Sequence, residues 1–125
     1  MLFLQYMSQS YRAGDFLVYQ LESAFALLRL LAIDETDDGR IWHLAGYSEF
    51  FPDVESAEAA LDSPGSFKKV LPHAALTERA FQSTQTAPLA NQPLSDDDLA
   101  PLNTWRESSD RSVSNISIRL LLGFR

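Results

Sequence analysis

The dipeptide Asp38-Gly39 lies between two strongly apolar stretches of this 125-residue chain. The first stretch runs from Phe25 to Ile33 and the second from Arg40 to Tyr47. Asp-Gly between two such stretches is typical of a tight β-hairpin, because Asp and Gly accept the backbone conformations that the turn requires. A hairpin needs a strand on each side of the turn. The sequence therefore predicts two adjacent antiparallel strands.

The stretch before this turn also has an interpretation as a helix. Its alanines and leucines have high intrinsic helix propensity, and apolar residues occupy every face from Ser23 to Ile33. The turn that follows favours a buried strand over Phe25 to Ile33, and a helix stays open as the alternative.

Three further strands are predicted from turn signals and alternating apolar residues. Phe16 to Leu21 follows a turn at Gly14-Asp15, and Phe67 to Leu71 is bounded by prolines. Near the end of the chain, apolar residues occur at every second position, which predicts a half-buried closing strand. These residues are Ile116, Ile118, Leu120, Leu122 and Phe124.

Capping residues predict short helices between the strands. Asp53 can cap a helix with an apolar stripe from Val54 to Leu61, and Thr77 can cap a helical turn that reaches Phe81. Ser95 with Asp98 forms a capping-box pattern, and Pro101 predicts that this helix is kinked or ends before Trp105. Residues 83–93 have the polar, proline-containing composition of a loop.

Short connections between strands, interrupted by peripheral helices, predict an α+β fold. We expect a small curved antiparallel sheet, or a partly open barrel, with one to three short helices around it. The length fits a single domain over residues 1–125. Residues 1–6 could be a start-site extension, because Met7 begins a second ordinary opening, MSQSYRAGD.

Acidic residues are concentrated in one part of the chain. Residues 34–62 contain nine Asp and Glu residues and a single base, Arg40, in a chain with a net charge of −7. This balance argues against nucleic-acid binding, which depends on clustered Lys and Arg. An acidic surface can attract a basic protein partner, and its alternative role is to keep the protein in solution.

Several classes of protein are not indicated by the sequence. The apolar runs are much shorter than the ~20 residues that span a bilayer, and no export signal is evident, so we expect a cytoplasmic protein without membrane contact. The chain has no cysteine. It also lacks HExxH, GxSxG and Gly-rich phosphate motifs, so no cofactor, no metal and no catalytic residue is assigned. An enzymatic role is the less favoured interpretation.

Four residues could line a pocket: Arg29, His43, Tyr47 and His73. In an extended segment, His43 and Tyr47 share one face of the strand, and Trp42 lies on the other. The alternative for His43 is a core histidine with one ring nitrogen bonded to a backbone carbonyl. The alternative for Arg29 is an edge position, or a pairing with Asp15 or Glu22.

The segment Arg12-Ala-Gly-Asp15-Phe-Leu-Val, the apolar strand containing Arg29, the acidic turn and the next strand together resemble the N-terminal part of bacterial immunity-type proteins from polymorphic toxin systems. The resemblance covers about the first fifty residues. It implies a small barrel-like fold and a non-catalytic protein that binds and blocks a partner.

Two functions follow from these patterns. The first is a non-enzymatic protein-binding module, of the immunity type that the resemblance implies, whose acidic surface and aromatic residues hold a basic partner. The candidate contact residues are Asp37, Asp38, Trp42, Phe50, Phe51, Asp53 and Glu55. The second is a small-molecule-binding or hydrolytic domain whose pocket contains His43, Tyr47 and His73. A homo-oligomer is compatible with both functions.

Overall fold

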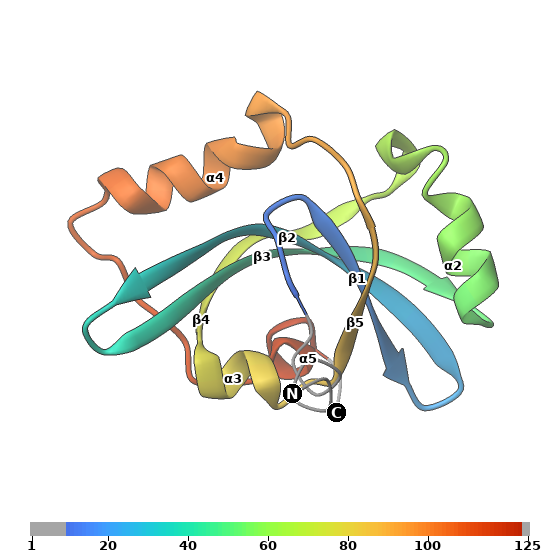
Figure 1. Cartoon of the computed structure of the whole chain (residues 1–125), viewed down its shortest axis with the longest axis horizontal. Coiled ribbons are helices and arrows are strands. Elements are labelled where there is room, and N and C mark those ends of the chain that lie inside the picture. The colour runs from blue at the N-terminus through green and yellow to red at the C-terminus, as the bar shows by residue number, and fades with distance from the viewer. Residues whose placement is uncertain (1–9, 124–125) are drawn as a thin grey trace, which may run out of the picture.

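Residues 10–123, which the computed structural model describes, form an open five-stranded antiparallel sheet with short helices on both faces (Figure 1). The predicted α+β fold is confirmed, and the sheet is not a closed barrel. The proposed start-site extension, residues 1–6, lies outside the described residues. The strand order is β4-β3-β2-β1-β5, with bounds β1 Asp15–Leu21, β2 Ala24–Thr36, β3 Gly39–Phe51, β4 Lys69–Thr77 and β5 Thr86–Asn91.

The hairpin predicted at Asp38-Gly39 is confirmed, and it joins the two longest strands. β2 and β3 pair antiparallel up to Thr36 and Gly39, and Gly39 has a φ of +117° that suits glycine. The helix alternative for residues 23–33 is therefore wrong. β3 continues to Phe51, beyond the predicted end at Tyr47, because its pairing with β2 extends to Phe25.

Both faces of the sheet are covered, which explains why β2 is apolar throughout. Leu28 and Leu30 point to the concave face and pack with Leu44, whereas Leu27 and Leu31 point to the opposite face. A strand buried on both sides lacks the polar alternation of a half-exposed strand. This is the physical reason why the sequence of β2 resembles that of a helix.

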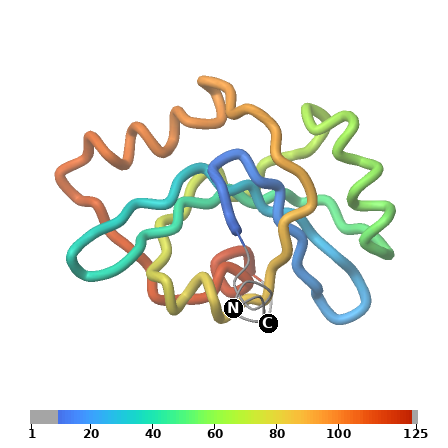
Figure 2. The backbone as a smooth tube through the Cα atoms, in the orientation of Figure 1, coloured from blue at the N-terminus to red at the C-terminus, as the bar shows by residue number. Residues whose placement is uncertain are grey.

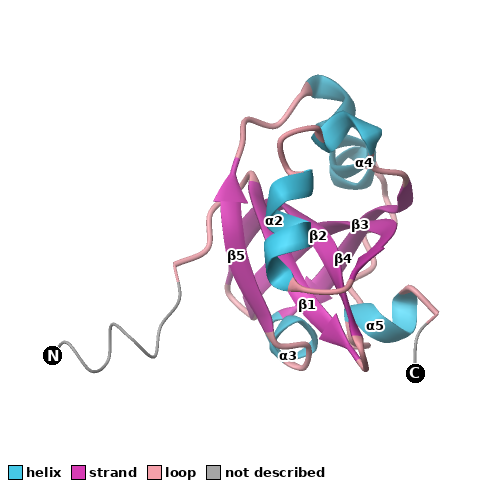
Figure 3. Cartoon of the chain, turned by 90° about the vertical axis from the view of Figure 1, so that its right-hand side faces the viewer, coloured by secondary structure: helices cyan, strands magenta, loops and turns pink. Residues whose placement is uncertain are grey.

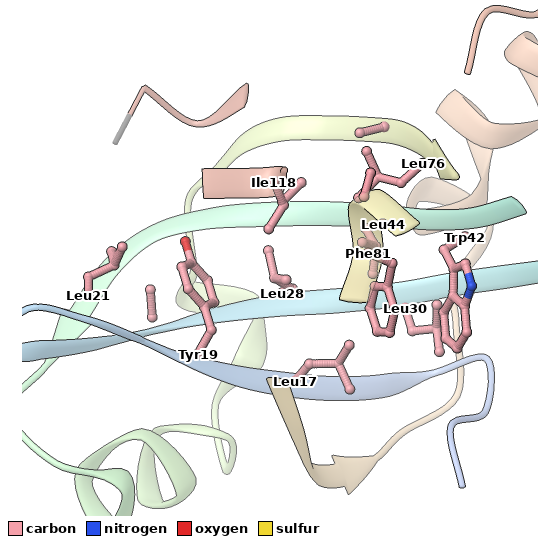
Figure 4. Packing of buried hydrophobic residues seen from close by; sticks show 13 residues of the cluster. Leu17, Tyr19, Leu21, Leu28, Leu30, Trp42, Leu44, Leu76, Phe81 and Ile118 are labelled. Atoms are coloured by element: carbon pink, nitrogen blue, oxygen red, sulfur yellow. The ribbon is translucent and has the colours of Figure 1, made fainter. Parts of the chain in front are cut away.

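Four α-helices cover the two faces of the sheet within the described residues (Figures 1 and 3). α3 and α5 close the concave face, where Phe81 and Ile118 join the largest buried cluster (Figure 4). α2 and α4 cover the convex face. Their bounds are α2 Val54–Ala60, α3 Glu78–Gln82, α4 Asp96–Glu107 and α5 Ile118–Leu121, and a 3-10 turn covers Pro64–Ser66. Among these residues, no helix is long and apolar enough to cross a bilayer.

The predicted helix caps are confirmed. Asp53, Thr77 and Ser95 each accept a hydrogen bond from a backbone N–H of the first turn that follows. The capping box of Ser95 and Asp98 is complete. The alternative in which this helix ends before Trp105 is wrong, since α4 runs through Pro101 to Glu107 and is held on the sheet by the buried Leu102.

Two assignments in the middle of the chain differ from expectation. β4 begins at Lys69 rather than Phe67 and passes through Pro72, and residues 83–93 contain a strand, β5. Both strands lie at the edges of the sheet, where the missing N–H of a proline interrupts fewer ladder hydrogen bonds. The sequence did not predict β5, because its residues have little strand propensity of their own and become a strand by pairing with β1.

The predicted closing strand near the C-terminus is also wrong. Residues 118–121 form α5, with Ile118 buried and Leu122 packed against the same cluster. Ile116 and Leu120 are exposed. In a pattern of apolar residues at every second position, residues four apart, such as Ile118 and Leu122, also lie on one face of a helix. The chain forms this helix rather than a strand. Phe124, the last residue of the pattern, lies outside the described residues.

Candidate functional site

Three side chains from three neighbouring strands form a continuous hydrogen-bonded chain. Asp34 of β2 contacts His43 of β3, with 2.9 Å between Oδ2 and Nε2. The other ring nitrogen of His43, Nδ1, lies 2.9 Å from Nε2 of His73 in β4. Arg106 of α4 binds the second oxygen of Asp34, with Nη2 2.6 Å from Oδ1. The convex face thus carries a polar cluster among apolar residues.

A tryptophan covers this cluster. The ring of Trp105 in α4 meets His43 edge to face at 4.8 Å between centroids, and it lies 5.8 Å from the ring of His73. His43 has no exposed surface, and His73 is partly exposed. His43 is therefore a core histidine as one interpretation predicted, but its partners are side chains rather than a backbone carbonyl.

His73 lies at the wall of a groove with a volume of about 350 Å³. The groove follows the outer side of β4 and is bounded by the end of α4, residues 112–114 and α5. Its lining residues are Leu71, His73, Ala74, Ala75, Trp105, Ser112, Val113, Ser114 and Leu121. This size lies at the lower end of the range for sites that bind small molecules.

Burial keeps both imidazoles neutral. The pKa of His73 is lowered to about 4, first by burial and then by the nearby His43 and Arg106. Burial also lowers the pKa of His43, against the opposing effect of Asp34. If Asp34 accepts the proton of His43 Nε2, Nδ1 of His43 accepts a hydrogen bond from Nε2 of His73. The remaining nitrogen of His73, Nδ1, is then an acceptor.

The cluster lacks the other parts of a hydrolytic site. In residues 10–123, no serine or threonine hydroxyl is hydrogen-bonded to His43 or His73. A histidine whose pKa is about 4 is also a weak base at neutral pH. The described part of the chain contains no group of three or more His, Asp or Glu side chains arranged to hold a metal ion.

Arg29 lies away from the histidines, on the central strand β2. Its guanidinium donates to the carbonyl oxygens of Gly14, Gln92 and Pro93 and lies 3.9 Å from Asp98. The expectations of an edge position and of a pairing with Asp15 or Glu22 are therefore wrong. The partners come from the ends of two loops and from α4, and no local pattern could reveal them.

Tyr47 shares a strand face with His43, as predicted, but belongs to another cluster. Its ring lies 6.1 Å from that of Phe16 and 5.5 Å from that of Phe67. Burial raises its pKa, and Arg29 acts in the opposite direction. The four predicted pocket residues thus separate into two pairs, His43 with His73 and Arg29 with Tyr47.

The predicted contact residues also lie in different environments, some buried and some exposed. Trp42 is buried, stacked on Phe81 at 3.9 Å, and donates its indole N–H to Glu78, so it offers no contact surface. Phe51 is half-buried against the cluster beneath α2. The exposed members are Asp37, Asp38, Phe50, Asp53 and Glu55.

The acidic stretch of residues 34–62 does not form one surface. Asp37 and Asp38 occupy the tip of the β2–β3 hairpin, which projects at one end of the sheet, whereas Asp53 and Glu55 lie by α2 at the other end (Figure 1). Asp34 is paired with Arg106, and Glu35 with Arg40. Asp37 and Asp38 at the hairpin tip form no ion pair among the described residues.

The sequence interpretation missed Asp34, Trp105 and Arg106 as members of the histidine cluster. They reach it from β2 and α4, and the two histidines are themselves thirty residues apart. Only the register of the strands brings these positions together. A search for family models found no match, and no curated protein or solved structure is significantly similar to the chain.

Proposed function

We propose that this protein is a non-enzymatic protein-binding module, and that an extended segment of the partner docks in the groove beside β4. The observation that carries this proposal is that the outer edge of β4 is unpaired along most of its described length. Residues 112–114 pair only with its last residues, where Ser114 N–H donates to Ala75 and Thr77 N–H donates to Ser114. Before Ala75, no described strand lies along this edge.

The surroundings of this edge suit an extended peptide. An unpaired edge offers backbone donors and acceptors to an added strand, and grooves beside it select the side chains of that strand. Val70 on β4 is 48% exposed and Leu121 on the groove wall is 38% exposed, so apolar contact is available at both sides. Trp105 and His73 form the far wall, where a neutral imidazole can accept a hydrogen bond.

The charge distribution supports a basic partner, and the sequence resemblance supports a partner that is bound and blocked. The hairpin tip carries Asp37 and Asp38, which can accelerate encounter with positive charge. The likeness of the first fifty residues to immunity-type proteins suggests a toxin domain encoded beside this protein. Binding would block that partner without chemistry on this chain.

Filling the groove tests the docking site. Ser112→Arg places a long side chain in the groove and removes no side-chain contact of the core, so the dissociation constant should rise at least about tenfold. Calorimetry against the purified products of the neighbouring genes measures this. Asn103→Arg, on the exposed side of α4, is the matched control and should bind normally. Equal affinity of the two variants for a bound partner would contradict docking in the groove.

Reversing the charge of the hairpin tip tests the electrostatic part. Asp37→Lys combined with Asp38→Lys should lower the association rate about tenfold at low ionic strength and have little effect at ~0.5 M salt, where the Debye length falls to a few ångströms. Stopped-flow measurement of association at several salt concentrations checks this. An unchanged rate at low salt would remove the role of the acidic tip.

A small-molecule-binding or hydrolytic role is the second candidate, and the Asp34–His43–His73 chain is the observation that favours it. In that case His73→Ala should abolish ligand binding or turnover while the groove variant Ser112→Arg retains a folded protein. The low pKa of His73 and the lack of a bonded hydroxyl in residues 10–123 support the protein-binding role instead.

A further inference from the structure

The contact between His43 and His73 limits the number of protons that the two rings can hold together. Nδ1 of His43 and Nε2 of His73 are 2.9 Å apart, and the ring centroids are 5.2 Å apart. One hydrogen lies between the two nitrogens in such a bond, because one nitrogen donates and the other accepts. When both rings are imidazolium ions, every ring nitrogen carries a hydrogen and no acceptor is left. The doubly protonated pair therefore cannot keep this contact.

A single added proton is compatible with the contact. If His43 takes this proton, its Nε2 donates to Asp34 and its Nδ1 donates to Nε2 of His73, which then carries its own hydrogen on Nδ1. Burial lowers the pKa of His43, and the carboxylate of Asp34 acts in the opposite direction. The first proton is thus held between β2 and β4 without a change of partners.

A second proton meets positive charge from two neighbouring elements. The pKa of His73 is lowered to about 4 by burial first, and then by His43 of β3 and Arg106 of α4. The carboxylate that faces these groups is Asp34 of β2, and one of its oxygens is already paired with Arg106. Within the described residues, no charged side chain besides His73 lines the groove. His43, His73 and Arg106 would then share one carboxylate, which makes the doubly protonated cluster repulsive.

The two rings differ in their access to solvent. His43 has no exposed surface and is covered by Trp105. His73 is partly exposed and lies at the wall of the groove beside β4. Since water stabilises a charged group, the ring that can reach solvent is the one that moves. We propose that the His43–His73 contact is a proton-operated latch, which one added proton leaves closed and a second one opens by turning the His73 ring into the groove.

An open latch changes the groove in two ways. The His73 ring occupies part of its volume of about 350 Å³. It also presents a positive charge where the closed latch presents a hydrogen-bond acceptor. If the groove binds a basic partner, acid should therefore release that partner. This consequence rests on the proposed function, whereas the latch itself does not.

An NMR titration of the free full chain tests the latch without any partner. Between about pH 7.5 and about pH 3.5, the two imidazoles should take up protons in two steps separated by at least about one pH unit. The NOE between the two rings should persist through the first step and disappear in the second, while the amides of β2 and β3 stay protected from exchange. Loss of the NOE in the first step, or its survival after the second, overturns the proposal. Simultaneous loss of amide protection does so too, since the whole sheet then opens.

His73→Gln is the control variant. Its amide carries both a donor and an acceptor, so it can stay bonded to Nδ1 of His43 in either protonation state. In the natural sequence, the amides of Ser112 and Val113 on the groove wall should shift in the second step. These shifts should be absent from the variant. The same shifts in His73→Gln would assign them to other titrating groups and overturn the latch.

Discussion

Replacing Arg29 by alanine should lower the free energy of unfolding by about 3–5 kcal/mol, the range for losing one partner of a buried charged network. Arg29 is only 5% exposed. Its guanidinium donates to the carbonyls of Gly14 at 3.0 Å, Gln92 at 2.8 Å and Pro93 at 3.1 Å. The alanine variant removes the guanidinium donor of the Gln92 and Pro93 carbonyls and one of the two donors to the Gly14 carbonyl. It also removes the positive charge beside Asp98 and leaves a cavity above the ring of Phe16.

Urea denaturation of the Arg29→Ala protein measures this effect. The matched control is Arg40→Ala, because the Arg40–Glu35 pair lies at the surface, with side chains 49% and 74% exposed. An exposed ion pair contributes about 0–1 kcal/mol. Arg29→Lys should recover only part of the loss, since an ammonium cannot reproduce the planar fork. Similar losses for Arg29→Ala and Arg40→Ala would show that the buried network does not stabilise the fold.

Acidification should destabilise the protein from pH 6.5 downward, because burial lowers the pKa of both His43 and His73, and His73 sets the window from pH 6.5 to about 4. The unfolded chain takes up a proton near pH 6.5, whereas the folded chain does so only near the lowered pKa of about 4. The unfolded state therefore binds more protons in this window, and stability rises with pH. Since His73 is partly exposed, we expect a total change of about 1–3 kcal/mol. Above pH 6.5 the histidine adds no pH dependence.

The free energy of unfolding, measured by urea titration at several pH values, checks this prediction. His73→Gln carries no titrating ring, so the slope between pH 6.5 and 4 should decrease. The lowered carboxyl pKa values of Asp53 and Asp98 act below the ordinary value of 3.8, outside this window. The same slope in His73→Gln and the wild-type protein would contradict the assignment to His73.

Features that depend on neighbouring residues were predictable from the sequence. The turn at Asp38-Gly39 and the caps at Asp53, Thr77 and Ser95 involve contacts within a few residues, so their chemistry is visible in the sequence. The same holds for the alternation that places Trp42 and His43 on opposite faces of β3. From these, the α+β class followed.

The C-terminal part shows where local patterns fail. The alternation of Ile118 with Leu122 fits both a strand and a helix, and the covered concave face decided for a helix. Residues 86–91 have little strand propensity of their own, and pairing with β1 makes them a strand. Figure 2 shows how this segment returns beside the first strand after a long excursion of the chain.

The sequence by itself determined the central hairpin, the helix starts and the class of fold, because each depends on backbone conformations that adjacent residues select. Only the tertiary structure decided which polar side chains meet. The register of β2, β3 and β4 joins Asp34, His43 and His73, and two loop ends supply the carbonyls that Arg29 binds. Contacts between residues distant in sequence depend on how all five strands assemble into the sheet. No single segment of the sequence contains that information.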